Sequence, residues 1–204
     1  MAITKTRNML IDVARQLFAK LGVENTTMND IAVASHKGRR TLYTYFNNKN
    51  EVYKAVVETE LDNMVKALQD VAAKDLPADE KLMLFFYTRL DAVKKVVARN
   101  GNLRADFFRD IWRVQNVRKT FDRKETQILK EILQKGVDEG SLSMPDVDFT
   151  AEILHNALRG LEVPYIRGLI NPIDSDNKRR YLNISHLIFC LLYTSPSPRD
   201  LSTS

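Results

Sequence analysis

A short segment in the first quarter of the chain, residues 27–49, combines two helical patterns, a tight turn and a one-sided charge distribution. Between Asp30 and Glu51 the sequence contains no acidic residue. The same interval carries four basic residues, namely Lys37, Arg39, Arg40 and Lys49. Two short helices with an uncompensated basic edge and interleaved Thr and Tyr side chains suit the phosphate backbone of DNA. The segment therefore predicts a helix-turn-helix element that binds DNA.

The boundaries of these helices follow from their caps. Apolar residues recur at helical spacing over 10–21, and Gly22 is expected to end that helix. The segment 27–30, Thr-Met-Asn-Asp, has the capping-box pattern that begins a helix. Gly38 follows the turn and is expected to cap a third helix over 39–46. Three helices are thus predicted for the N-terminal part.

The rest of the chain continues with the helical period and shows no β alternation. Pro, Gly and Asn residues interrupt the apolar pattern and mark the ends of successive helices. The expected fold class is all-α, with about nine helices. Beyond the first three, they are expected at about 48–74, 80–99, 103–114, 118–139, 147–168 and 178–192.

Composition limits the function classes. Of the 204 residues, 44% are hydrophobic and 28% charged, which is ordinary for a globular protein with a packed core. The formal net charge of +5 fits a nucleic-acid partner. Cys190 is the one cysteine, so a disulfide within the chain and a cysteine-based zinc site are excluded. No apolar run approaches the roughly 18 residues of a membrane span, and the start lacks a secretory pattern. A cytoplasmic protein without membrane contact is expected.

Several motifs in the first sixty residues occur at characteristic spacings. They are Ala14-x-x-Leu17-Phe18 with Gly22 after it, Thr26-Thr27, Ile31-Ala32, Thr41-Leu42-Tyr43-x-Tyr45-Phe46 and Lys49. On these motifs, residues 7–58 resemble the N-terminal domain of the tetracycline-repressor (TetR) family of bacterial transcription regulators. The resemblance implies an N-terminal helix-turn-helix domain followed by a helical effector-binding and dimerisation domain.

The turn departs from the family pattern. The family commonly has Ala-Gly-Val-Ser there, whereas this chain has Ser35-His36-Lys37-Gly38. His36 thus replaces the usual turn glycine, and Gly38 replaces the usual capping serine. Glycine is an acceptable N-cap, so the fold is expected to survive. The phosphate contact of a serine is lost, and Lys37 with its neighbouring arginines is expected to replace it.

The resemblance also divides the chain. Residues 1–48 are expected to form the DNA-binding domain and 49–192 the ligand-binding and dimerisation domain, with 48–74 as the linking helix. The final segment, 193–204, departs from every pattern before it and is rich in Ser, Thr and Pro. We interpret it as a non-native or disordered tail and exclude it from the fold.

Arg39 and Arg40 lie in the first turn of the expected recognition helix, the part that approaches base edges in helix-turn-helix proteins. Arginine reads guanine through two hydrogen bonds, so one of the pair is expected to read a base and the other to contact phosphate. The sequence leaves open which does which. The residues expected to contact DNA are Thr27, Lys37, Gly38, Arg39, Arg40, Thr41, Tyr43, Thr44, Tyr45 and Lys49.

For four of these residues the expected role can be stated in more detail. The resemblance implies that Tyr43 packs partly against its own domain and offers its hydroxyl to a phosphate, while Thr44 and Tyr45 face the duplex. For Tyr45 the alternative is a half-buried aromatic residue beside Phe46. Lys49 lies at a helix N-terminus, where the helix dipole already favours a phosphate.

The C-terminal part supplies the remaining expectations. Aromatic residues concentrate in its middle, and a pocket for a small effector is expected there, lined by Phe86, Phe108, Trp112 and His155. The three histidines are scattered with no pair at metal-ligand spacing, so no metal site is expected. The resemblance implies that two helices, at about 147–168 and 178–192, form a four-helix bundle with a second copy. Their dimer faces are Ile153, Leu154, Ala157, Leu158 and Leu161, and Ile184, Leu187, Ile188 and Leu191.

Together these observations predict a DNA-binding transcriptional regulator, specifically a repressor that a small-molecule effector releases from an inverted-repeat operator. Its expected partners are double-stranded DNA, the effector and a second copy, with no cofactor. One alternative keeps the fold but drops the effector, leaving a DNA-binding adaptor. A second, an enzyme, finds no support in any nucleophile–base spacing, metal cluster or phosphate-binding glycine loop.

Overall fold

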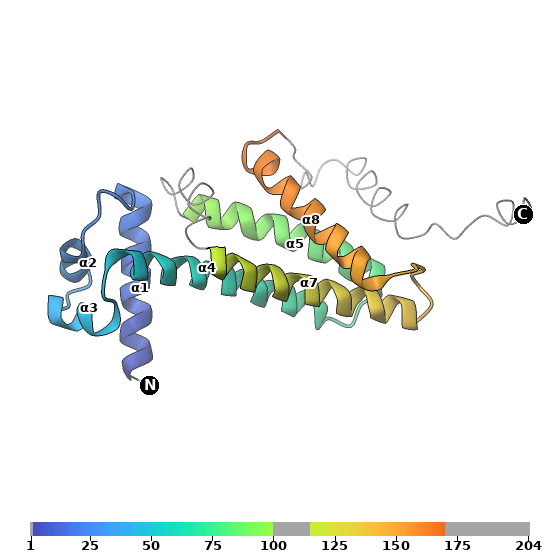
Figure 1. Ribbon diagram of the computed structural model, residues 1–204, viewed down its shortest axis with the longest axis horizontal. Helices are drawn as coiled ribbons and strands as arrows, with labels where there is room; N and C mark the ends of the chain where they lie inside the picture. Colours follow the sequence, from blue (N-terminus) through green and yellow to red (C-terminus); the bar gives the residue numbers. More distant parts are fainter. Residues whose placement is uncertain (1, 100–114, 170–204) are drawn as a thin grey trace, which may run out of the picture. The chain divides into compact units, whose positions relative to one another are not determined.

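The computed structural model describes residues 2–99 and 115–169, and its described elements are helices connected by turns and loops (Figure 1). No strand occurs within these ranges. In chain order the helices are α1 (Ala2–Leu21), α2 (Met28–Ala34), α3 (Arg39–Tyr45), α4 (Lys49–Ala72), α5 (Ala78–Arg99), α7 (Gln115–Asp138) and α8 (Val147–Ile166). Among the described helices, none combines the length and apolar character needed to cross a membrane.

The all-α fold class is therefore confirmed, although the described helices number seven rather than nine. The helices expected at 103–114 and 178–192 lie outside the described residues. α1 begins at Ala2, earlier than its apolar stripe indicated. α8 contains Pro164 within the helix and ends at Ile166, two residues before the expected end at about 168.

The chain divides into two compact units. Unit 1 comprises residues 1–63 and 94–121, and unit 2 comprises 64–93 and 122–204. α4, α5 and α7 each contribute residues to both units. The domain boundary expected after residue 48 remains a prediction.

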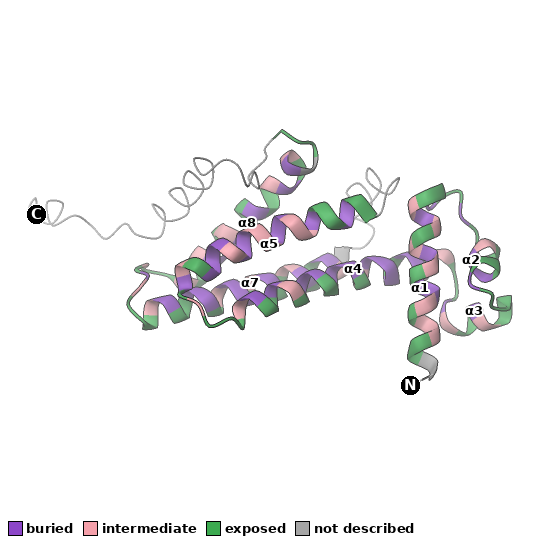
Figure 2. Ribbon diagram, turned by 180° about the vertical axis from the view of Figure 1, so that it is seen from behind, coloured by how far each residue is buried: buried purple, intermediate pink, exposed green. Residues whose placement is uncertain are grey.

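The core of unit 1 forms where α1 meets the helix-turn-helix and the start of α4. Leu10, Phe18, Ile31 and Leu42 are all fully buried, and they come from α1, α2 and α3. The Phe18 and Tyr53 rings form a T-shaped pair at a centroid distance of 6.0 Å, which joins α1 to α4. α2 packs against the long helix α1, and α3 packs against α2 (Figure 2).

A buried carboxylate adds an electrostatic contact to unit 1. Glu60 on α4 is 2% exposed, and its Oε2 accepts a hydrogen bond from Arg99 Nη2 at 2.8 Å. Arg15 Nε on α1 lies 4.0 Å from Oε1 of the same carboxylate. The buried charge is thereby compensated by cations from two other helices.

Unit 2 has an apolar core of its own, which includes Leu68, Phe85, Leu129 and Leu133. Its helices pack closely at Gly136, near the end of α7. A Cβ atom built there would lie 2.5 Å from Leu142 Cδ1 and 2.8 Å from Ala78 Cβ. Only a residue without a side chain lets α7 approach the start of α5 and the α7–α8 connection this closely.

Candidate DNA-binding surface

The turn between α2 and α3 ends α2 in a Schellman motif. Lys37 N–H donates to Ala32 O at 3.1 Å, and His36 N–H donates to Val33 O at 3.0 Å. This hydrogen-bond pair requires a left-handed residue between helix and turn, a position that glycine usually occupies. His36 adopts it with φ of 52°, the one described non-glycine residue with positive φ. The fold therefore survives the replacement of the turn glycine, at the expense of local backbone strain.

The start of α2 is fixed by the expected capping box. Thr27 Oγ1 accepts from Asp30 N–H at 3.1 Å, and the Asp30 carboxylate accepts from Thr27 N–H at 2.8 Å. The Thr27 hydroxyl also donates to Asp30 Oδ2 at 2.7 Å. These hydrogen bonds, the side-chain one first, lower the pKa of Asp30 because they favour the carboxylate. Capping thus accounts for Thr27, and its DNA contact remains a prediction.

α3 presents its cations to solvent. Gly38 caps the helix without a side-chain hydrogen bond, and Leu42 N–H donates to Gly38 O at 3.2 Å. Leu42 is fully buried and anchors one side of the helix. Lys37, Arg39 and Arg40 are all exposed, at or just before the first turn. Three cations beside free N-terminal N–H groups make this end strongly attractive to phosphate.

The remaining α3 side chains differ in exposure. Tyr43 is 43% exposed and Thr44 is exposed, whereas Thr41 and Tyr45 are half-buried. Thr44 Oγ1 donates to Arg40 O at 3.0 Å. Tyr43 is thus more accessible than Tyr45, although the resemblance implied that Tyr43 packs partly against its own domain and that Tyr45 faces the duplex. Their DNA contacts stay predictions.

Lys49 has a structural role that the sequence did not indicate. Its Nζ donates to Val23 O at 2.7 Å and to Glu24 O at 3.2 Å, so it fastens the start of α4 to the loop after α1. A phosphate contact would have to use the remaining donor or displace one of these carbonyls. Lys49→Ala is therefore a poor probe of phosphate binding, because it also removes the contact with the loop.

Another residue missed by sequence reasoning is Asn47. The carboxylate of Glu51 accepts from Asn47 N–H at 2.9 Å and from its side-chain amide at 3.0 Å. Asn48 Oδ1 accepts from Glu51 N–H at 3.0 Å, which satisfies a backbone donor in the first turn of α4. The Asn47 hydrogen bonds, the side-chain one first, lower the pKa of Glu51. The Asn-Asn pair immediately before Lys49 is the sequence feature that could have indicated these hydrogen bonds.

The expected dimer face on α8 contains residues from two sides of the helix. Leu158 is 3% exposed and belongs to the core of its own unit, which removes it from an outer face. Ile153 and Ala157 are exposed, and Leu154 and Leu161 are half-buried. Phe149, 61% exposed, and Val163, 43% exposed, extend the exposed apolar side. Ile184, Leu187, Ile188 and Leu191 lie outside the described residues.

The expected effector pocket is only partly described. Phe86 and His155 are both buried in unit 2. Phe108 and Trp112 lie outside the described residues. His155 Nδ1 is 2.8 Å from Glu125 Oε2, so this ring nitrogen is hydrogen-bonded to a carboxylate of the protein itself. The pocket remains a prediction.

Comparison with known proteins agrees with this geometry. Residues 10–56 match the family model described as bacterial regulatory proteins, tetR family. The chain is 26% identical over 164 residues to the probable acrEF/envCD operon repressor of Escherichia coli K12, covering 77% of this chain and 74% of that protein. The capped helix pair, its exposed cations and these matches define a helix-turn-helix DNA-binding regulator.

Solved structures share the fold beyond the DNA-binding segment. A transcriptional regulator from Cytophaga hutchinsonii superimposes with a TM-score of 0.71 at 22% identity, covering 92% of this chain and 98% of that one. SmeT, the repressor of a Stenotrophomonas maltophilia multidrug efflux pump, solved as its triclosan complex, gives 0.66 at 18% identity, covering 94% and 93%. Residues 10–56 thus match the tetR family of bacterial regulatory proteins, and the solved structures share the fold over most of the chain.

Proposed function

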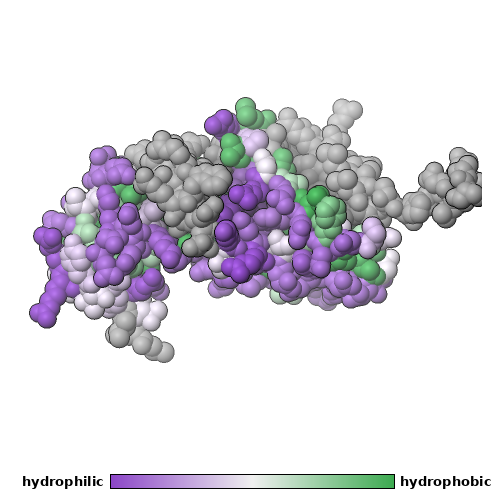
Figure 3. All heavy atoms as spheres, viewed as in Figure 1, coloured by the Kyte–Doolittle hydropathy of each residue, from purple (hydrophilic) through white to green (hydrophobic). Residues whose placement is uncertain are grey.

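We propose that the protein is a homodimeric repressor whose α3 helices bind an inverted-repeat operator and whose C-terminal part binds a small effector. The observation that carries the proposal is the exposure of Lys37, Arg39 and Arg40 around the first turn of α3, while Leu42 of the same helix is held in the core. Hydrophilic side chains cover much of the visible surface of unit 1 (Figure 3). Such a helix end presents both charge and donor groups to a major groove.

The test begins with the operator, identified by selecting bound duplexes from random DNA. Arg39→Ala and Arg40→Ala are then measured against single-base operator variants at several salt concentrations. We expect one change to relax preference at one base pair by about 1–3 kcal/mol. The other should lower affinity evenly and reduce the magnitude of the salt slope by about one. Adjacent positions of a helix point about 100° apart, which is why they should differ.

Arg167→Ala provides the matched control, because Arg167 is an exposed arginine that caps α8 in unit 2. It should leave operator affinity and salt slope unchanged. Equal effects of Arg39→Ala and Arg40→Ala would contradict the division of roles. If neither differs from Arg167→Ala, α3 does not bind the operator.

The proposed dimer uses the exposed apolar side of α8, which we call the α8 face and define as Phe149, Ile153, Ala157, Gly160 and Val163. At 100° per residue these positions fall on one side of the helix, and Leu158 falls opposite them. An exposed apolar stripe of this kind is typical of a protein–protein interface. In a symmetric dimer the same face would meet itself across a two-fold axis.

Ile153→Glu places a charge in the α8 face and should convert dimers to monomers, with loss of tight operator binding. Sedimentation measures the first effect and a DNA-binding titration the second. Asn63→Glu introduces the same charge at an exposed α4 position and should leave the dimer intact. A fully dimeric Ile153→Glu protein would place the interface elsewhere.

The proposed effector acts by shifting the spacing of the two α3 helices away from the roughly 34 Å between successive major grooves. The SmeT–triclosan complex supports a small apolar molecule as the class of ligand. The protein must change from 99:1 in favour of the DNA-binding state to 1:99. This shift requires the effector to bind the released state more tightly by about 5.5 kcal/mol. An apolar compound library screened for release of labelled operator tests this step. A compound that binds the protein without releasing operator would favour the effector-independent adaptor.

A further inference from the structure

Unit 2 contains a buried group of charged and polar side chains drawn from three helices. Arg89 on α5 is fully buried, and its Nε donates to Glu125 Oε1 on α7. Its Nη2 donates to Glu162 Oε1 on α8. Burial alone would lower the pKa of Arg89, but the two carboxylates outweigh that effect and raise it. Arg89 therefore remains a cation, and it holds the Glu125 carboxylate in one orientation.

The other oxygen of Glu125 orients a histidine. Glu125 Oε2 lies 2.8 Å from His155 Nδ1, and both residues are buried. A carboxylate already bound to a guanidinium can only accept a hydrogen bond, so Nδ1 carries the proton and donates it. In the neutral ring, Nε2 is then the atom with the lone pair. A histidine held at Nδ1 by a carboxylate, with Nε2 available, is the usual arrangement of a metal-ligating imidazole.

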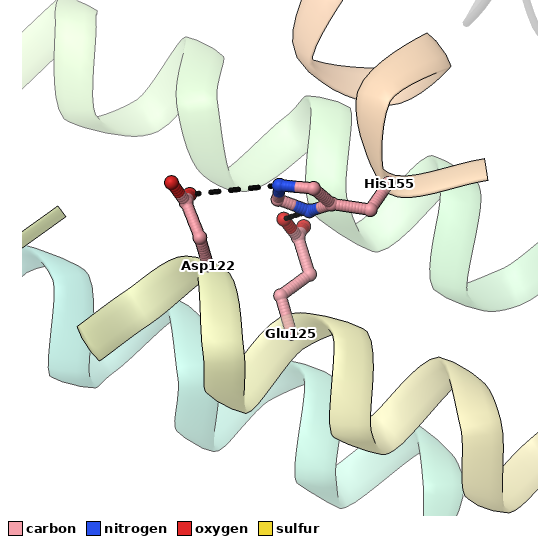
Figure 4. A group of neighbouring side chains, drawn as sticks. All are labelled: Asp122, Glu125 and His155. Atoms are coloured by element: carbon pink, nitrogen blue, oxygen red, sulfur yellow. Dashed lines mark hydrogen bonds and ion pairs between the residues drawn. The ribbon is translucent and has the colours of Figure 1, made fainter. Parts of the chain in front are cut away.

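His155 Nε2 faces a second carboxylate. Asp122 Oδ1 lies 3.8 Å from it, too far for a hydrogen bond (Figure 4). Metal–ligand bonds of about 2.1 Å that meet at a tetrahedral angle separate their two ligand atoms by about 3.4 Å. The distance between Asp122 Oδ1 and His155 Nε2 would therefore have to shorten only slightly for both atoms to bind the same ion. Ligand atoms of Asp122, Glu125 and His155 all lie within 4.8 Å of one another.

We propose that Asp122, Glu125 and His155 form a binding site for a divalent transition-metal ion, zinc being the best fit. Asp122 Oδ1 and His155 Nε2 are the ligands, and Glu125 is the positioning residue that orients the imidazole. Mixed imidazole and carboxylate donors suit Zn²⁺ far better than Mg²⁺, which prefers oxygen ligands. Water or a bound small molecule completes the coordination. The ion would join α7 to α8.

Two features of the surroundings are compatible with this role. Arg159 Nη1 lies 3.9 Å from Asp122 Oδ2, the oxygen that the proposed site does not use, and the Arg159 side chain is 46% exposed. Asp122 itself is only half-buried, which gives an ion from solvent a point of entry. The site is independent of the proposed DNA binding, because all of its residues belong to unit 2.

The experiment is a calorimetric titration of the chelator-treated full chain with ZnCl₂, and separately with MgCl₂. The chain has three histidines, so the double variant His36→Gln/His186→Gln leaves His155 as the one imidazole. We expect the double variant to bind one Zn²⁺ per chain as tightly as the unchanged protein. Adding His155→Gln should weaken binding at least about 10-fold, and Mg²⁺ should give no saturable heat.

Asp122→Asn provides a second variant that keeps the size of the side chain, and it should also weaken Zn²⁺ binding at least about 10-fold. Glu131→Gln, an exposed carboxylate on the same helix, should change nothing. Circular dichroism establishes that each variant is folded. Absence of saturable Zn²⁺ binding overturns the site. Binding that survives in folded Asp122→Asn protein, or that is lost in the double variant, overturns it equally.

Discussion

The helix-turn-helix and the buried cluster of unit 2 both concentrate charged side chains, but they differ in how far apart those residues lie in the chain. Lys37, Arg39 and Arg40 fall within four positions and point into water. Arg89 and Glu162 are 73 positions apart and meet in the core. Exposed charges interact weakly, whereas buried ones must be compensated by a partner. Perturbing the long-range contacts should therefore cost much more stability than perturbing the local ones.

The largest loss is expected from Glu125→Gln, which leaves Arg89 with one carboxylate instead of two. Breaking a buried ion pair from one side should lower the free energy of unfolding by roughly 3 kcal/mol. Lys54→Ala removes an exposed pair with Glu58 and should cost within about 0.5 kcal/mol. Urea unfolding measures both. Similar losses would mean that burial does not distinguish the two kinds of charge contact.

Gly136→Ala tests the packing of the same unit. The added methyl group would overlap Leu142 and Ala78, so we expect a loss of about 1–3 kcal/mol in the free energy of unfolding. Lys66→Ala is the control, because Lys66 is at an exposed position of α4. That change should alter the free energy of unfolding by no more than about 0.5 kcal/mol. Thermal and urea unfolding should give the same sign for Gly136→Ala. A Gly136→Ala protein with an unchanged free energy of unfolding would contradict the close contact.

His36→Gly addresses the local turn. Glycine adopts the left-handed conformation without strain, and the gain, reduced by glycine's extra flexibility, should be about 0.5–1 kcal/mol. His36→Val places a β-branched residue at the same φ and should lower stability by about 1–2 kcal/mol. The difference between the two variants in urea unfolding is the decisive quantity. If they are equally stable, the positive φ carries no strain.

The smallest effect is expected from Asp30→Asn. The Asp30 pKa is lowered in the folded protein, so its stabilising effect is present above the unfolded-state pKa near 4 and is lost as pH falls through the folded value. The stability difference from the unchanged protein should therefore shrink as pH falls below about 4. Asp70→Asn, at an exposed position of α4, should show no such trend. A difference that grows toward acid pH would reverse the assigned sign.

Local signals in the sequence predicted the DNA-binding element well. The capping box at Thr27, the C-cap at Gly22 and the Gly38 cap are all present in the structure. Each depends on residues a few positions apart, so propensity and hydrogen-bonding patterns determine them. The role of Lys49 was missed because its carbonyl partners lie 25 and 26 positions away.

The α8 face shows where periodicity alone was insufficient. α8 is apolar on two sides, and the pattern could not tell which side faces the core of its own protomer. The structure places Leu158 in the core and leaves Ile153 and Phe149 exposed. Burial is decided by neighbouring helices, and their positions do not follow from the sequence of α8 itself.

The sequence by itself determined the all-α class, the helix-turn-helix with its caps, and the exposed cations of α3, because these depend on short-range spacing. Only the tertiary structure brought Asp122 and Glu125 together with His155, which follows thirty positions later on another helix. The sequence therefore predicted no metal site, since the three histidines have no local ligand spacing. Helix packing determines which distant side chains meet. The helical period of a single segment shows which of its faces is apolar, but it does not show which other helix packs there.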